Sequence, residues 1–296
     1  AGRRPPAGLG PAPGETLRSS ALSLSDGGRL PRLGFGTGIF YRDPPAVLAA
    51  IRQAAELGYT HFDCAQAYHN EEVVGMALKA SGVPRARLFL ASKLSSLEDY
   101  GREATPRLVR SQLRKLQTEY LDLYYFHGDM GDASKEREAW QALERLHGEG
   151  LVRHLGLSNY RTAGIERVLS FARVRPTVLQ VKFDVYHPGF QWAVEDVDDV
   201  VALAQRQGLA VVGYSALSGW PNLLRATSDP HVRSIAERHG RTAAQLLLRH
   251  SLERGLAVIP SSADPAHIAS NAEVFNFSLS EADTAQLELL ARLAAF

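Results

Sequence analysis

Four residues with side chains suited to proton transfer lie at or just after the ends of short apolar segments: Asp63, Tyr68, Lys93 and His127. A tyrosine has an ordinary pKa of about 10 and is a weak acid at neutral pH. A nearby ammonium stabilises tyrosinate and lowers that pKa, and a carboxylate beside the lysine keeps it charged. A histidine can donate a hydrogen bond to a carbonyl oxygen. Brought together, these groups would form a general acid that protonates a developing alkoxide. A buried ion pair beside a packed tyrosine is the alternative.

The segments around these residues alternate between short apolar runs and stretches with helical spacing. A hairpin is predicted first, with arms at 22–24 and 29–33 around a Gly-rich turn. Strands are then predicted at residues 33–36, 60–65, 88–93, 121–127, 152–158, 177–183, 210–215 and 256–259. Helices are predicted at 45–57, 70–79, 106–116, 135–147, 163–171, 197–207, 242–253 and 265–271, with a final amphipathic helix at 281–293.

Strand–helix units repeated in this way predict an α/β fold, a (β/α)8 TIM barrel with an N-terminal β-hairpin. A doubly wound open sheet is the alternative fold. It would require a Gly-rich fingerprint directly before a helix, and the glycines at 34, 36 and 38 lack both that spacing and a following helix start.

The composition is that of a globular protein, with 296 residues, 45% hydrophobic and 22% charged. Residues 1–14 are rich in proline and glycine and cannot pack a core. We therefore predict a flexible N-terminal tail at 1–21 and a single barrel domain at 22–296. The tail is interpreted first as plain disorder, with a linker or a processed targeting remnant as alternatives. The expected location is cytoplasmic, or an organelle (plastid or mitochondrion) if the tail is a processed targeting segment.

Several function classes are disfavoured by composition. The net charge is +1, so no basic face for nucleic acid is implied. The only cysteine is Cys64, which excludes a disulfide framework and a cysteine zinc site. Packing is the first interpretation of this thiol and redox sensitivity the second. No apolar run approaches the roughly 18 residues of a membrane span. His61 and Asp63 share a strand face, but the later strand ends lack metal ligands, so no metal is predicted.

The later strand ends suit a nucleotide, because the active end of such a barrel is formed where the strands end. Ser158, Asn159 and Gln180 offer hydroxyl and amide groups for a carboxamide. Tyr214 offers a flat face for stacking. A helix predicted to begin at Pro265 provides an N-terminus where a phosphate could bind. Ordinary loops are the alternative for each of these segments.

From about Ser23 to Glu281 the chain resembles the aldo-keto reductase superfamily. The stretches that carry the resemblance are Leu33-Gly34-Phe35-Gly36-Thr37-Gly38, His61-Phe62-Asp63-Cys64-Ala65-Gln66-Ala67-Tyr68-His69-Asn70-Glu71, 88–93, 123–127, Gly156-Leu157-Ser158-Asn159-Tyr160 and Ile259-Pro260-Ser261-Ser262. The resemblance implies that Asp63, Tyr68, Lys93 and His127 form the catalytic tetrad, with Tyr68 as general acid. It implies that nicotinamide cofactor contacts come from Gly36, Thr37, Ser158, Asn159, Gln180, Tyr214, Ser215, Leu217, Ser261, Ser262, His267 and Asn271.

The chain departs from the family pattern in two places that bear on its ligands. Ser261 and His267 stand where most relatives carry a lysine and an arginine for the cofactor's 2′-phosphate. The resemblance still implies NADPH as the cofactor, and the two missing charges make NADH use plausible as well. Gly128-Asp129 replaces a common Trp-Pro, which favours a more open and polar pocket. The Gln180-Val181-Lys182-Phe183 stretch also differs from the family pattern.

The predicted function is reduction of a small-molecule aldehyde or ketone to an alcohol by a protein that is monomeric by default. A cofactor-binding regulatory or scaffold subunit of a larger complex is the first alternative. A barrel repurposed for cyclisation or isomerisation is the second.

Overall fold

The computed structural model describes residues 10–12, 14–38, 43–187, 199–217 and 225–293. Within them, eight parallel strands pair in the order β10-β9-β8-β7-β6-β5-β4-β3. The strands are β3 (Gly34–Gly36), β4 (His61–Asp63), β5 (Phe89–Leu94), β6 (Leu121–Phe126), β7 (Val152–Ser158), β8 (Val178–Lys182), β9 (Ala210–Tyr214) and β10 (Leu256–Val258). A parallel bridge between Leu33 and Val258 joins the two edges, and Val258 N donates to Arg32 O at 2.7 Å. The predicted (β/α)8 barrel is confirmed.

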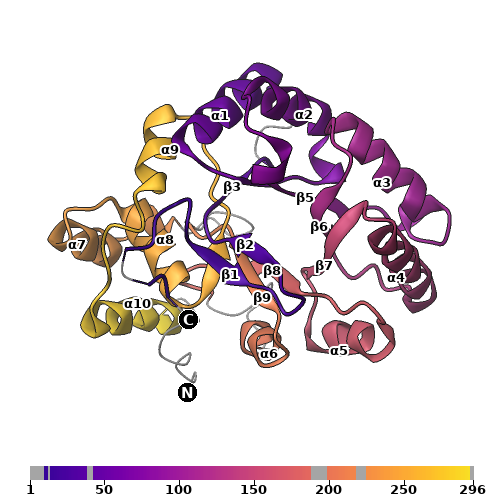
Figure 1. Ribbon diagram of the computed structural model, residues 1–296. Coiled ribbons are helices and arrows are strands. Elements are labelled where there is room, and N and C mark those ends of the chain that lie inside the picture. Colours follow the sequence, from indigo (N-terminus) through magenta and orange to yellow (C-terminus); the bar gives the residue numbers. More distant parts are fainter. Residues whose placement is uncertain (1–9, 13, 39–42, 188–198, 218–224, 294–296) are drawn as a thin grey trace.

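Helices surround the barrel on its outside (Figure 1). They are α1 (Pro44–Leu57), α2 (Glu71–Ala80), α3 (Ala104–Lys115), α4 (Ala133–Gly148), α5 (Thr162–Phe171), α6 (Val200–Arg206), α7 (Pro230–Arg238), α8 (Ala243–Glu253), α9 (Pro265–Ala272) and α10 (Glu281–Leu293). Short 3-10 helices are η1 (Gln66–Tyr68), η2 (Arg85–Arg87), η3 (Leu97–Asp99) and η4 (Ala226–Ser228). None of the described helices combines the length and apolar character needed to cross a membrane.

Local sequence signals set the ends of several helices. Asp43 caps α1 by accepting from Ala46 N, and Gly58 ends it with a φ of 100°. Thr242 and Gln245 form a reciprocal capping box at α8. Side-chain oxygens at these positions satisfy backbone N–H groups that lack partners inside the helix. These caps fix where each helix begins and therefore how long the preceding loop is.

The hairpin of β1 (Ala21–Ser23) and β2 (Arg29–Pro31) lies across one end of the barrel (Figure 1). Its Leu24 and Leu30 join one cluster with the barrel's inner residues, among them Phe89 at the start of β5. The hairpin therefore closes the end where the strands begin. The polar residues predicted at the strand ends lie at the opposite end of the barrel.

Two details differ from the sequence-based expectations or extend them. Helix α7 lies in the connection after β9, where no helix was predicted, although Asp229 caps it and Pro230 occupies its first turn. In the predicted tail, residues 1–9 and 13 lie outside the described residues. Leu17 packs against the barrel core, and buried Ser20 donates a hydrogen bond to Glu15.

Candidate active site

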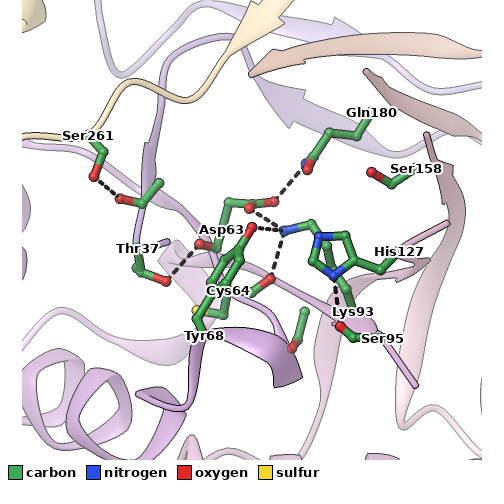
Figure 2. A network of polar contacts seen from close by, with 12 residues as sticks. Thr37, Asp63, Cys64, Tyr68, Lys93, Ser95, His127, Ser158, Gln180 and Ser261 are labelled. Atoms are coloured by element: carbon green, nitrogen blue, oxygen red, sulfur yellow. Dashed lines mark hydrogen bonds and ion pairs between the residues drawn. The ribbon is translucent and has the colours of Figure 1, made fainter. Parts of the chain in front are cut away.

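A buried ion pair between Lys93 and Asp63 forms the centre of the site (Figure 2). Both side chains project from strand ends into the barrel and are almost completely inaccessible to solvent. Lys93 Nζ also donates to Cys64 O at 2.8 Å and lies 3.4 Å from the Tyr68 hydroxyl. The ammonium has three N–H donors and here meets three acceptors. Gln180 Nε2 donates to the second carboxylate oxygen of Asp63 at 2.8 Å.

Tyr68 comes from η1, the turn that follows β4, and its hydroxyl reaches the Lys93 ammonium. Burial raises the pKa of Tyr68 above its ordinary value, and the Lys93 charge offsets only part of that rise. The expected lowering by Lys93 is therefore present as an opposing effect, but it does not dominate in the chain alone. Burial also acts to lower the pKa of Lys93, yet its interactions with the Asp63 carboxylate and the Tyr68 hydroxyl outweigh burial and raise that pKa. The result is a charged lysine beside a protonated tyrosine.

His127 follows β6 and turns its ring toward Tyr68. The two ring centroids are 5.8 Å apart at an interplanar angle of 81°. Burial, and then the Lys93 charge, lower the pKa of His127 to about 3, so the ring is neutral at physiological pH. Ser95 Oγ lies 2.7 Å from His127 Nδ1. The backbone at this position is fixed by a bond from His127 N to Leu94 O at 2.9 Å. The structure thus brings together all four residues predicted for the catalytic site.

The predicted carboxamide-binding residues form their own network beside His127. Asn159, with a φ of 58°, donates from Nδ2 to His127 O at 2.8 Å and to Ser158 Oγ at 3.1 Å. Tyr214 OH donates to Asn159 Oδ1 at 2.8 Å. The Asn159 amide is therefore held by the protein, and the one hydrogen bond that its oxygen accepts from the described residues comes from Tyr214. Ser158, the last residue of β7, is the register partner of Gln180 in the middle of β8.

Gly36 and Thr37, predicted to contact the cofactor, also hold the first loop against its neighbours. Thr37 is fully buried, and both its N–H and its hydroxyl donate to Asp63 O at 3.0 Å. Gly36 N donates to Pro260 O at 3.0 Å, and Ser261 Oγ donates back to Gly36 O at 2.5 Å. A Cβ at Gly36 would lie 2.8 Å from Ile259 O, which explains the glycine. These contacts join β3 to the loop after β10.

A cavity of about 500 Å³ lies beside that loop. Five of the predicted cofactor residues line it, namely Leu217, Ser261, Ser262, His267 and Asn271. Ser215, with a φ of 53°, begins the turn that leads toward it. The helix start expected to bind phosphate is already capped, because Asp264 accepts from Ala266 N at 2.8 Å. This cap uses the Ala266 N–H and places a carboxylate at the helix start.

Arg225 lines the same cavity and was missed from the sequence. It lies in the connection after β9, four residues before the Asp229 cap of α7. No periodic pattern marks that connection, so the only sequence signal was a basic residue near the Asp-Pro start of an unpredicted helix. Glu71, Ser95 and Gln112 were also missed, and each contacts a residue of the site or its immediate neighbour.

Other sequence interpretations can be placed. His61 is fully buried at the hairpin end, 3.2 Å from Pro31 O through Nδ1. No group of three or more His, Cys, Asp or Glu side chains suited to a metal occurs among the described residues. Cys64 is buried, and burial raises the pKa of its thiol. Asp129, expected to make the pocket polar, pairs with Arg167 of α5 at 2.7 Å.

The fold defines the class of protein: a (β/α)8 barrel, here with a buried cluster of acidic and basic side chains where the strands end. The model of the Aldo/keto reductase family matches residues 32–292, and the chain belongs to that family. Aldo-keto reductase family 1 member A1 of Rattus norvegicus is 38% identical over 303 residues, 93% of this chain and 90% of that protein.

Morphine 6-dehydrogenase of Pseudomonas putida is 32% identical over 282 residues, 92% of each chain. The crystal structure of an aldo/keto reductase from Brucella melitensis has a TM-score of 0.83 at 34% identity, and the match covers 92% of this chain and 99% of that one. Membership of this family supports an oxidoreductase that reduces carbonyl compounds.

Proposed function

We propose that this chain reduces an aldehyde or ketone to an alcohol with a nicotinamide cofactor, and that Tyr68 is the general acid. The observation that carries the proposal is the hydrogen bonding of Lys93. Its three N–H donors meet Asp63, Cys64 O and Tyr68 OH. Because the Tyr68 oxygen accepts from Lys93, its own proton is directed elsewhere and can be given to a substrate oxygen.

The charges around Tyr68 fit this role. Burial raises its pKa, so the hydroxyl stays protonated at neutral pH. As a carbonyl oxygen becomes an alkoxide, the Lys93 ammonium stabilises the tyrosinate left behind. Asp63 keeps Lys93 charged, and Gln180 and Thr37 hold Asp63 in place through its second carboxylate oxygen and its backbone carbonyl. Neutral His127 can donate a second hydrogen bond to the same substrate oxygen.

The residues present fit a dinucleotide cofactor. The cavity beside Ser261 and Ser262 has room for one end of it, and hydroxyl and amide groups converge on the strand ends between that cavity and Tyr68. When bound, the cofactor supplies the hydride that adds to the carbonyl carbon. We propose NADPH as the preferred form, because Arg225 lines the cavity and its guanidinium can replace the absent lysine and arginine.

Substitution of the general acid tests the proposal. The wild-type chain is expected to oxidise NADPH in the presence of at least one member of a panel of aldehydes and ketones. Tyr68→Phe removes only the hydroxyl and is expected to reduce kcat about 10²–10⁴-fold, with an unchanged Kd for NADPH. A Tyr68→Phe variant with full turnover would contradict the assigned acid. A wild-type chain that binds cofactor and reduces none of the panel would favour the scaffold alternative.

A further inference from the structure

Ser95 lies two residues beyond Lys93, where β5 ends, and its backbone is held in place. Ser95 N donates to Gln66 Oε1 at 3.0 Å, and Gln66 Nε2 donates to Asp99 Oδ2 at 2.6 Å. Among the contacts of the described residues, its hydroxyl has one partner, His127 Nδ1 at 2.7 Å. The Ser95 backbone is therefore held in place, and its hydroxyl is oriented toward His127.

The His127 ring has two ends with different neighbours. Nδ1 faces Ser95, and the opposite ring nitrogen lies on the side of the Lys93 ammonium and the Tyr68 hydroxyl (Figure 2). A neutral imidazole carries its proton on only one nitrogen, and the hydrogen bond at one nitrogen decides which tautomer is present. The tautomer in turn decides whether Nε2 offers a proton or a lone pair to a substrate oxygen.

We propose that Ser95 is a positioning residue that donates its hydroxyl proton to His127 Nδ1 and so keeps the imidazole proton on Nε2. The tautomer of His127 does not depend on the proposed function, but the expected effect of Ser95 on turnover rests on it. The opposite arrangement, in which Nδ1–H donates to Ser95 Oγ, would leave the serine proton without an acceptor among the described residues. Because Ser95 is partly exposed, that proton would have to turn to water, whereas the proposed arrangement pairs it with an acceptor within the protein.

The arrangement also suits the substrate oxygen. That oxygen must accept the Tyr68 proton, and it has a second lone pair for Nε2–H. An Nε2 lone pair would instead repel the oxygen and compete for the Tyr68 proton. Ser95 thus acts through His127 and touches neither substrate nor cofactor.

The tautomer can be read without cofactor or substrate. We would record two-bond ¹H–¹⁵N correlations of the histidine-labelled chain and assign His127 from the spectrum of His127→Asn. The expected wild-type pattern is an unprotonated Nδ1 and a protonated Nε2. Ser95→Thr, which keeps the hydroxyl, should give the same pattern, and Ser95→Ala should give a mixture of tautomers. A protonated Nδ1 in the wild type, or an unchanged spectrum for Ser95→Ala, would overturn the proposal.

Kinetics supply the second readout. Ser95→Ala is expected to lower kcat about tenfold, the size of effect of one hydrogen bond, with KM and the NADPH Kd within about twofold. Ser95→Thr should restore kcat. Ser96→Ala is the matched control, because this neighbouring serine makes no side-chain cap bond to η3. An active wild type whose kcat is unchanged in Ser95→Ala would refute the positioning role.

The two proposals fail in different ways. A wild type that reduces no carbonyl would refute the proposed function, while the NMR pattern would still decide the tautomer. An active enzyme that depends on Tyr68 but shows a protonated Nδ1 would leave the function intact and refute the role of Ser95.

Discussion

Ser92 Oγ donates a hydrogen bond to Glu71 Oε1 at 2.6 Å, and this bond ties the strand that carries Lys93 to the helix that begins three residues after Tyr68. Gln112 Nε2 donates to the same carboxylate oxygen at 2.9 Å and to Lys93 O at 3.2 Å. Tyr124 OH donates to Gln112 Oε1 at 2.6 Å. This buried network lies directly behind the site and fixes the separation between the tyrosine and the lysine.

Removal of the Glu71 carboxyl is expected to destabilise the fold. Glu71→Ala would leave the buried Ser92 hydroxyl without its acceptor, at a cost of about 1–3 kcal/mol in the free energy of unfolding. Gln112 Nε2 would keep Ser92 Oγ and Lys93 O as acceptors. Glu71→Gln keeps an acceptor oxygen and serves as the matched control, with a much smaller loss. Urea unfolding of both variants gives the comparison. Equal stabilities would show that the network contributes nothing.

The difference in stability between Glu71→Gln and wild type is expected to depend on pH. Burial raises the pKa of Glu71, against the hydrogen bonds from Ser92 and Gln112 and the Lys115 charge. A carboxyl whose pKa is higher in the folded state stabilises the fold below its unfolded pKa of about 4.3, and that contribution is lost as pH rises through the folded value. Glu71→Gln stays neutral, so its stability relative to wild type should improve between about pH 4 and pH 7. A constant difference would contradict a raised pKa.

The strand-end residues of the site could be predicted from the sequence because of a simple geometric rule. Parallel strands end at one face of a barrel, so Asp63, Lys93 and His127 had to converge once the strands were recognised. The partners of those residues could not be predicted in the same way. Ser95 and Glu71 contact the site through particular rotamers and through loops, and neither follows from strand or helix periodicity.

The residues that line the cavity also divide into those that could be predicted from the sequence and those that could not. Ser261 and Ser262 follow the last predicted strand, so their place beside the cavity was accessible from the sequence. Arg225 belongs to a connection whose path is set by the packing of η4 and α7, which the periodic pattern does not describe. The Asp264 cap was also missed, since the sequence analysis placed a helix start at Pro265 without identifying the side chain that caps it.

The pH profile of turnover is expected to be flat from about pH 5 to pH 9 and to fall above about pH 10. Reduction needs protonated Tyr68, and burial raises its pKa from an ordinary value of about 10. The pKa of His127 is lowered to about 3, so the ring does not titrate in the neutral range. Steady-state kcat across this range with one carbonyl substrate is the measurement. A transition between pH 6 and pH 7 would mean that His127 ionises during turnover.

Removal of the Arg225 guanidinium is expected to change cofactor preference. Arg225→Gln should weaken NADPH binding about tenfold, the lower end for a charge-assisted hydrogen bond because this side chain is exposed. NADH binding should stay within about twofold, since only NADPH carries the additional phosphate. Fluorescence titration with each cofactor measures both constants.

Arg233→Gln is the matched control for that experiment. Arg233 is an exposed arginine of α7 that does not line the cavity, and the change in net charge is the same. An equal loss of NADPH affinity in both variants would mean that the net charge of the protein, and not a contact with Arg225, sets the affinity. An unchanged affinity in Arg225→Gln would remove this residue from phosphate recognition.

Gly36→Ala is expected to damage both the fold and the cofactor cavity. The new Cβ would meet the backbone oxygen of Ile259 at 2.8 Å, and backbone cannot move aside as a flexible side chain can. Separation of β3 from the loop after β10 should cost about 1–3 kcal/mol in stability. It would also shift Ser261, whose hydroxyl donates to Gly36 O, so the Kd for NADPH should rise.

Gly148→Ala at the end of α4 is the control, because nothing lies within 4 Å of its Cβ position. Since alanine favours a helix over glycine by up to about 1 kcal/mol, that variant should be at least as stable as wild type and bind NADPH normally. A Gly36→Ala protein with wild-type stability and affinity would mean that β3 and this loop separate without cost, and that their contact does not shape the cavity.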